Sequence, residues 1–284
     1  MKRRKTIDLI TSYIISIVIL VVFIGPFLWL IISSISPEFE LKSVPVHWFP
    51  ESPTFDNYLN LIKGTGKDLA SRYFMESVRN SLIVAVLTTG ICLFVGSFSA
   101  YAFSRMRFKG KYPLLILILL IQLLPTIAII IPLFLIVSNL HLLDTKTGLI
   151  LVYCSFTLPY IIWSMKGYFD TIPVSLEEAA EIDGCTKTQA LFKIILPLSK
   201  PGLIAAAIFS ILSVWSEFLI AVVFSSTDVA KTIPVVISEF QSRFTLSYGM
   251  MAAASVIASI PPVIFGLLTS KHLVGGLAAG GVKE

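Results

Sequence analysis

Five long stretches of the chain contain no Asp, Glu, Lys or Arg, and each is long enough to cross a lipid bilayer as a helix. They are residues 9–37, 80–104, 112–143, 147–165 and 244–270. A hydrocarbon core of about 30 Å requires roughly 20 helical residues at about 1.5 Å each. A sixth stretch, residues 201–227, has a similar length and one charged residue, Glu217. The sequence therefore predicts six membrane-spanning helices.

The composition agrees with a membrane protein, because 56% of the residues are hydrophobic and 14% are charged, against about 25% charged in a typical soluble domain. Transmembrane β-barrels alternate apolar and polar residues in short segments, and residues 114–124 show no such alternation. We therefore expect an all-α membrane protein. The net charge of +5 does not indicate nucleic acid, because the basic residues cluster beside the spans, as membrane orientation requires.

The basic residues also predict the orientation of the chain. Fourteen of the 22 Lys and Arg residues lie in the termini and in the loops on the same side as the termini. An excess of basic residues marks the cytoplasmic side, so both termini are expected in the cytoplasm of a multi-pass protein of the cell membrane. We expect a first span with an extracytoplasmic segment (1–75), a core (76–270) and a cytoplasmic tail (271–284), with a short helix near residues 57–62.

Several residues inside the spans are candidates for special roles. Prolines at positions 26, 125, 132, 159, 261 and 262 predict bent or broken helices. Glu217 is the one Asp, Glu, Lys or Arg in the six spans, and such a residue is a functional candidate by default. We interpret it as a buried or cavity-lining hydrogen-bonding group, with contact to substrate as the alternative. Gln122 is expected to bond between helices or to lie with Glu217 on a translocation path.

The fourth and fifth spans are joined by a polar loop, residues 166–200, which is longer than a turn between packed helices requires. Ser175 and Glu178 have the spacing of a capping box, so a short helix is predicted over residues 176–183. Gly184 stands where a left-handed C-terminal cap is expected. This segment is therefore predicted to be structured.

A helical wheel of residues 176–183 predicts two different faces. The first contains Leu176, Ala179, Ala180 and Asp183, and the second contains Glu177, Glu178 and Glu181. A helix this short is unstable alone in water, so it must dock on another surface. The alanines allow close approach, and the acidic face is available to a basic partner.

A second amphipathic helix is predicted in the same loop. Its apolar residues recur at helical spacing and are Ala190, Leu191, Ile194, Ile195 and Leu198. Pro197 is expected to end this helix, and Pro201 to begin the fifth span.

The loop residues together have the spacing of a known motif. Glu178-Ala179-Ala180 is followed after three residues by Gly184, after nine more by Ile194, and after one more by Leu196-Pro197. This pattern resembles the EAA loop of ABC-importer permeases, which have the type I importer fold with six transmembrane helices. Further segments resemble the smaller permease subunit of maltose-type importers: residues 80–82, 101–108, 166–169, 175–180 and 275–283.

The resemblance implies that residues 176–184 form a coupling helix, which docks in a cleft of a separate ATPase with Glu178 facing a basic residue. The residues implied in docking are Glu177, Glu178, Ala179, Ala180, Asp183, Gly184, Ile194, Leu196 and Pro197. The C-terminal tail would reach the interface between the ATPase subunits through Gly275, Gly276, Ala279, Gly280 and Gly281.

Members of the family work with a second, different permease subunit, two ATPase copies and an extracytoplasmic sugar-binding protein. This chain would then be no enzyme. It contains no phosphate-binding loop of the form G-x-x-x-x-G-K-[ST], so ATP and Mg²⁺ would be bound by the partner ATPase, and no cofactor or metal by this chain. In the maltose system the sugar contacts lie in the other permease subunit, so few specificity residues are expected here.

Two alternatives stay open on the sequence. An ion-coupled secondary transporter would also have many spans and bent helices, but it predicts charge partners inside the membrane and gives the polar loop no purpose. A permease of the same kind for another solute, such as a peptide, an amino acid, phosphate or glycerol phosphate, would share the loop motif. The flanking matches favour a sugar, and in particular a di- or oligosaccharide.

Overall fold

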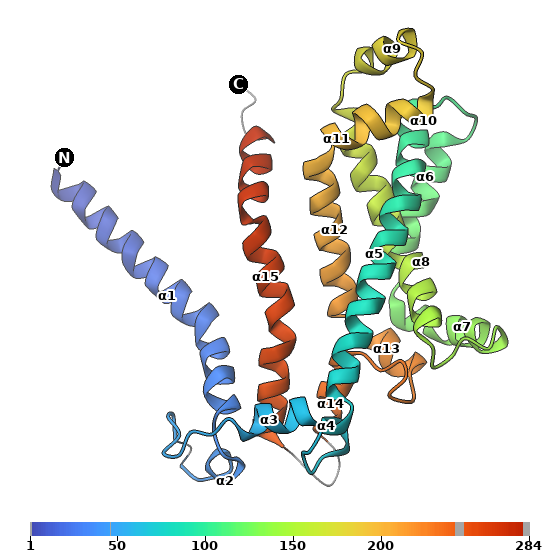
Figure 1. Ribbon diagram of the computed structural model, residues 1–284. Helices are drawn as coiled ribbons and strands as arrows, with labels where there is room; N and C mark the ends of the chain where they lie inside the picture. Colours follow the sequence, from blue (N-terminus) through green and yellow to red (C-terminus); the bar gives the residue numbers. More distant parts are fainter. Residues whose placement is uncertain (1, 46, 242–246, 281–284) are drawn as a thin grey trace. The chain divides into compact units, whose positions relative to one another are not determined.

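The computed structural model describes residues 2–45, 47–241 and 247–280, and every regular element in these ranges is helical (Figure 1). For residues 2–8, 10 and 268–280 it describes the helical backbone alone. The chain divides into two compact units, Met1–Met75 with Val236–Ile260 and Glu76–Val235 with Pro261–Glu284. The expected all-α fold is confirmed.

Four helices are long and apolar enough to cross a membrane. They are α1 (Lys2–Ser34), α5 (Phe74–Arg105), α8 (Lys146–Asp170) and α15 (Tyr248–Gly280). Two bent pairs of helices pass the same test together, so the described part of the chain has up to six spans. The expectation of six is met when each bent pair counts as one span.

The predicted third span is broken in the middle. It consists of α6 (Lys111–Leu120), the 3₁₀ turn η1 (Ile121–Leu123) and α7 (Thr126–Asn139), and the two parts are bent by 100°. Pro125 lies directly before α7. Its ring fixes φ and it has no N–H to donate, so the expected break at a proline is confirmed here.

The predicted fifth span is also interrupted, although it contains no proline after its first residue. Helix α12 (Lys200–Trp215) ends well before α13 (Leu219–Phe224) begins. The prediction of one continuous helix over residues 201–227 is therefore wrong. The residue at the centre of the interruption is Glu217.

Helix α8 forms the centre of the second unit, and two glycines let its neighbours approach it closely. A Cβ at Gly96 of α5 would lie 2.6 Å from Cγ2 of Ile161 in α8. A Cβ at Gly202 of α12 would lie 2.4 Å from the ring of Tyr168, also in α8. Since real Cβ atoms do not approach other atoms so closely, both helix contacts require glycine.

A polar cluster at the N-terminus of α8 holds three segments of the second unit together. Asp144 accepts hydrogen bonds from the backbone N–H groups of Ser226 and Thr227 at 2.8 and 2.9 Å, and from the Thr227 hydroxyl at 2.6 Å. Lys146 donates to the Asn80 side chain at 2.9 Å. Burial raises the pKa of the Asp144 carboxyl group, but the Thr227 and Ser226 donors outweigh it, and the pKa lies below its ordinary value.

The first unit contains the three short helices α2 (Glu38–Leu41), α3 (Asp56–Lys63) and α4 (Leu69–Arg72). The helix expected near residues 57–62 is α3. Glu38 accepts the backbone N–H groups of Tyr248 and Gly249 at 3.2 and 3.0 Å, which are among the unpaired donors at the start of α15. Another short helix, α14, spans Ile233–Glu239.

Candidate functional site

The predicted loop helix is present as α9 (Ser175–Ile182). It ends as expected, because Gly184 follows it with a left-handed φ of +86°, a conformation that costs glycine little. Its beginning differs from the prediction. Val174 is the N-terminal cap residue and makes no side-chain bond, so Ser175 and Glu178 form no capping box.

A capping box exists eleven residues later, at the start of α10 (Lys187–Ala190). The Thr186 hydroxyl accepts the N–H of Gln189, and the Gln189 side chain accepts the N–H of Thr186. The chain continues through a π-helical segment, Leu191–Ile195, into α11 (Leu196–Leu198). Helix α11 includes Pro197 and ends at Leu198, so the helix continues one residue beyond the predicted stop.

The apolar face of this second loop helix is partly as predicted. Ala190, Leu191 and Ile195 are buried, whereas Leu198 is exposed. Leu191 and Ile195 pack in one core with Tyr101 of α5 and Phe169 of α8. This segment therefore connects the polar loop to the helices of the second unit. Ile194 and Leu196 are half-buried and Pro197 is exposed.

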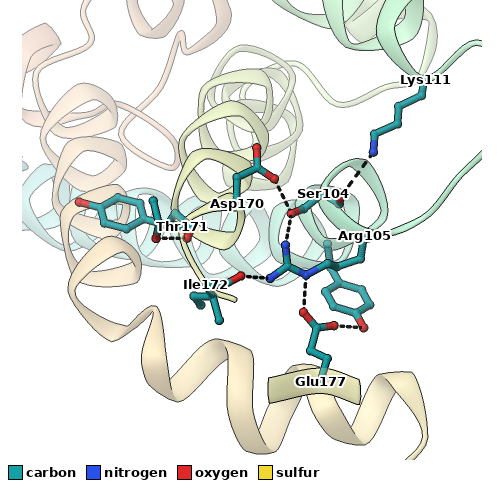
Figure 2. A network of polar contacts seen from close by, with 9 residues as sticks. Ser104, Arg105, Lys111, Asp170, Thr171, Ile172 and Glu177 are labelled. Atoms are coloured by element: carbon teal, nitrogen blue, oxygen red, sulfur yellow. Dashed lines mark hydrogen bonds and ion pairs between the residues drawn. The ribbon is translucent and has the colours of Figure 1, made fainter. Parts of the chain in front are cut away.

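Glu177 joins α9 to other elements of the second unit through polar contacts (Figure 2). Its carboxylate forms an ion pair with Nε of Arg105, the last residue of α5, and accepts a hydrogen bond from the Tyr101 hydroxyl at 2.8 Å. Arg105 also donates to the backbone carbonyl of Ile172 at 2.8 Å. The arginine thus joins the end of α5 both to α9 and to the segment before it.

A second group of contacts continues from the same arginine along the ends of α5 and α8. The Ser104 hydroxyl accepts a hydrogen bond from Arg105 at 3.1 Å and donates one to Asp170 at 2.6 Å. Lys166 pairs with the other oxygen of Asp170, and Lys111 donates to the Ser104 carbonyl at 3.4 Å (Figure 2). The polar contacts therefore reach α5, α8 and the start of α6.

The structure corrects the predicted faces of α9. Glu177 was expected on an exposed acidic face, but it is buried together with Ala180. Its spacing from Glu178 puts the two side chains about 100° apart on the helix, so that of the three glutamates only Glu178 and Glu181 remain exposed. The other exposed residues are Ser175, Leu176, Ala179, Ile182, Asp183 and Gly184.

Ile182 was not singled out from the sequence, and it is 87% exposed at the end of α9. A large apolar side chain with no cover in its own chain marks a contact surface when it stands among other accessible apolar groups. Leu176 and Ala179 supply these on the same helix. The exposure of Ile182 depends on how α9 packs against the rest of its own chain, which no local sequence pattern shows.

Glu217 and Gln122, expected from the sequence on one path, lie on the same cavity of about 340 Å³ in the second unit. Its lining comes from η1 and the start of α7, from α8, and from α12 with the break before α13. Its lining residues are Gln122, Leu124, Thr126, Tyr153, Phe156, Thr157, Tyr160, Phe209, Ser213, Val214, Glu217 and Ile220. The structure therefore brings two candidate residues 95 positions apart to one place.

The Glu217 carboxylate accepts hydrogen bonds from the backbone at the break itself. It accepts the N–H of Ile220 at 2.9 and 3.1 Å and that of Ala221 at 3.2 Å. The Tyr153 hydroxyl of α8 donates to it at 2.8 Å. The backbone contacts provide acceptors for two of the N–H groups that have no partner within the first turn of α13. Glu217 thus forms hydrogen bonds and lines the cavity, and its described contacts include no charged partner of the kind an ion-coupled transporter would need.

Comparison with known proteins decides the family. Residues 69–274 match the model of the family described as "Binding-protein-dependent transport system inner membrane component". The chain belongs to this family of transport permeases. The permease is 38% identical to the trehalose transport system permease protein SugB of Mycobacterium tuberculosis, over 91% of this chain and 92% of SugB.

Other relatives of the permease match over almost their whole length. Identity is 35% with the sulfoquinovosyl glycerol transport system permease protein SmoH of Agrobacterium fabrum, over 95% and 93% of the two chains. It is 33% with the trehalose/maltose transport system permease protein MalG of Thermococcus litoralis, over 99% of each chain. The resemblance noted in the sequence is thereby confirmed.

A solved structure shares the fold of the permease. A chain of a bacterial ABC transporter involved in the import of the acidic polysaccharide alginate superposes with a TM-score of 0.80, covering 95% of this chain and 97% of that one at 24% identity. The expected fold, that of an ABC-importer permease, is confirmed.

The predicted tail residues lie at the end of α15. The backbone is helical through Gly275, Gly276, Ala279 and Gly280, while Gly281 lies outside the described residues. The role expected for these residues at an ATPase interface stays a prediction.

Proposed function

We propose that the chain is the membrane-spanning permease subunit of an ATP-driven importer that carries a sugar, and that it hydrolyses no ATP itself. The observation that carries this proposal is the exposed surface of α9, with Glu178, Ile182 and Asp183 facing outward while Glu177 anchors the helix. An isolated helix of eight residues is unstable in water. An anchored one with free apolar and acidic groups fits a partner subunit.

The partners of this subunit are a second, different permease subunit, two ATPase subunits that bind ATP and Mg²⁺, and an extracytoplasmic sugar-binding protein. The polar loop and both termini lie in the cytoplasm, where the basic residues are concentrated. A sugar as the solute is supported by the names of relatives such as the trehalose permease protein SugB and the trehalose/maltose permease protein MalG.

Coupling follows from the contacts of α9. Closure of the ATPase subunits on ATP moves the helix seated on them. Because Glu177 binds Arg105 and Arg105 binds the Ile172 carbonyl, α9 carries the end of α5 and the segment after α8 with it. Leu191 and Ile195 pack on the same core as α8 and α12, and these two helices line the cavity. A displacement of the loop therefore changes access to the cavity.

Purification of the complete complex in lipid tests the proposal. We expect an ATPase to co-purify with the tagged chain, and hydrolysis to increase when the binding protein is supplied with one sugar from a panel of mono-, di- and oligosaccharides. Glycerol phosphate, amino acids and peptides are the matched negative solutes. Purification without any ATPase would contradict coupling through α9, and stimulation by a negative solute alone would contradict a sugar as the substrate.

A further inference from the structure

The cavity at Glu217 lies where two interrupted helices meet, and such interruptions are unusual inside a bilayer. Backbone without helical hydrogen bonds is tolerated at membrane depth where it is buried in protein or lines a water-filled cavity. Here η1 contributes Gln122 and the break before α13 contributes Glu217. In transporters, interrupted helices of this kind form substrate sites. The backbone alone therefore makes the cavity a candidate binding site.

The polar groups of the cavity retain hydrogen-bonding capacity. Of the two Glu217 oxygens, Oε2 accepts from Tyr153, Ala221 and Ile220, whereas Oε1 accepts from Ile220 alone. A carboxylate offers about four acceptor positions, so Oε1 can accept a further hydroxyl. The Gln122 amide makes no hydrogen bond with the described residues and can both donate and accept.

Two aromatic rings stand on the same cavity. Tyr160 of α8 and Phe209 of α12 have centroids 3.8 Å apart and planes inclined by 31°. Phe209 is 46% exposed. Aromatic faces carry negative charge density, which attracts the C–H groups on the apolar face of a sugar ring. An aromatic wall beside a few placed polar groups is the usual form of a small-molecule site.

The negative charge of the cavity favours neutral sugars over acidic ones. Among its lining residues, which all belong to the described chain, none is Lys, Arg or His, and Glu217 alone carries a carboxylate. An acidic sugar would meet like charge in an environment of low dielectric constant, where repulsion is strong. The fold does not impose this property, because the alginate transporter that shares it imports an acidic polysaccharide.

We propose that the cavity lined by Gln122, Tyr160, Phe209 and Glu217 is a subsite in this chain for one ring of a neutral saccharide, and that it disfavours acidic sugars. This rests on the proposed function as a sugar importer. The ring stacks on Phe209 and Tyr160, and its hydroxyl groups bond Oε1 of Glu217 and the Gln122 amide. The chain then contributes specificity itself, contrary to the expectation of few specificity residues.

The test uses the whole complex with its ATPase subunits in nanodiscs, without the binding protein, so that the binding protein does not select the sugar. Equilibrium binding of maltose, trehalose and cellobiose is compared with that of digalacturonate. We expect saturable binding of at least one neutral sugar and none of digalacturonate at the same concentration. Equal binding of digalacturonate would overturn the proposal.

Three variants locate the binding. Phe209→Leu keeps an apolar side chain but removes the ring, and we expect it to raise the Kd of the neutral sugar about tenfold. Phe94→Leu changes an exposed aromatic residue of α5 outside the cavity and should leave the Kd unchanged. Glu217→Gln keeps an acceptor oxygen and removes the charge, and it should allow digalacturonate to compete.

The outcomes also separate this inference from the proposed function. An unchanged Kd in Phe209→Leu, or no sugar binding while the loaded binding protein still stimulates hydrolysis, overturns the subsite and leaves the importer assignment in place. Failure of any ATPase to co-purify overturns both.

Discussion

Arg105 at the end of α5 and Glu177 in the first turn of α9 form an ion pair in which the two side chains are 11% and 8% exposed. A pair at this depth adds little net stability, since desolvation of the two charges offsets their attraction. Its consequence is geometric. With Glu177 turned toward Arg105, the neighbouring Glu178 and the terminal Ile182 face outward.

Removal of one partner of this pair should be costly. Glu177→Ala leaves Arg105 buried without its countercharge, and we expect a loss of about 3 kcal/mol of stability. Thermal unfolding of the purified complex measures the change. The double variant Arg105→Met, Glu177→Met should lose less than Arg105→Met and Glu177→Met lose in sum when each is made alone.

An exposed pair provides the control for that experiment. Lys42 pairs with Glu38 four residues earlier, with side chains 49% and 36% exposed. Such pairs contribute about 0.2–1 kcal/mol, so Lys42→Ala should lower the unfolding temperature little. If Glu177→Ala is as mild as Lys42→Ala, the Arg105 contact does not fix α9.

Glu178 should matter for coupling and hardly at all for folding. Glu178→Lys reverses the charge of an exposed side chain that would face a basic ATPase residue. We expect normal insertion and unfolding temperature, but loss of sugar-stimulated hydrolysis and of uptake. Glu51→Lys is the matched control, because its side chain is 77% exposed in the other unit. Normal uptake by Glu178→Lys would count heavily against docking through α9.

Ile182 supplies the apolar part of the same predicted contact. Ile182→Ser removes a side chain that is 87% exposed, so the fold loses no core packing. Loss of an apolar contact of this size costs roughly 1.5–3 kcal/mol, and we expect at least about tenfold weaker association of the ATPase, measured on titrated complexes. Ile62→Ser, at a 57% exposed position of α3, should change nothing. Equal effects of the two variants would exclude a specific role of Ile182.

The spans and the loop helix could be predicted from the sequence because their signals are local. Long charge-free runs predict the membrane-spanning helices, Pro125 predicts one break, and Gly184 predicts the end of α9. The second break could not be predicted this way. At this break the Ile220 N–H donates to the side chain of Glu217, and in a sequence the same glutamate looks like one charge in a continuous helix.

The position of the candidate site along the chain could be predicted from the sequence, but the buried and exposed faces of α9 could not. A helical wheel of α9 cannot show that Glu177 has a partner 72 residues away, since the pairing depends on how α5 and α9 pack. Ser175 with Glu178 and Thr186 with Gln189 have the same capping-box spacing, and only the second pair forms the box. Spacing alone does not distinguish them.

Close packing of α5 on α8 should depend on Gly96. Gly96→Ala would place a Cβ 2.6 Å from Cγ2 of the fully buried Ile161, and such overpacking costs about 1–3 kcal/mol. Gly90→Ala on the same helix meets nothing within 4 Å, so it should be neutral or slightly stabilising, because alanine favours helix over glycine. Unfolding temperatures of the two variants test this. A loss of stability in both would point to a contact with a partner subunit along α5.

Asp144 should stabilise the second unit in a way that depends on pH. Its φ of +57° is a left-handed conformation that Asn also tolerates, so Asp144→Asn removes the charge without adding backbone strain. The carboxylate accepts from Ser226 and Thr227, and hydrogen bonds to a charged group are worth about 1.5–3 kcal/mol. We expect a loss of about 2 kcal/mol at neutral pH.

The sign of the pH dependence follows from the lowered pKa of Asp144 in the folded chain. A carboxyl group whose pKa is lower folded than unfolded contributes its stability above the unfolded value of about 3.9, and the contribution is lost as pH falls through the folded value. The difference in unfolding temperature between the native chain and Asp144→Asn should therefore stay constant from about pH 5 to 8 and shrink only below about pH 4. A difference that already disappears near pH 6 would show that another group, and not Asp144, holds the start of α8 to the segment after α13.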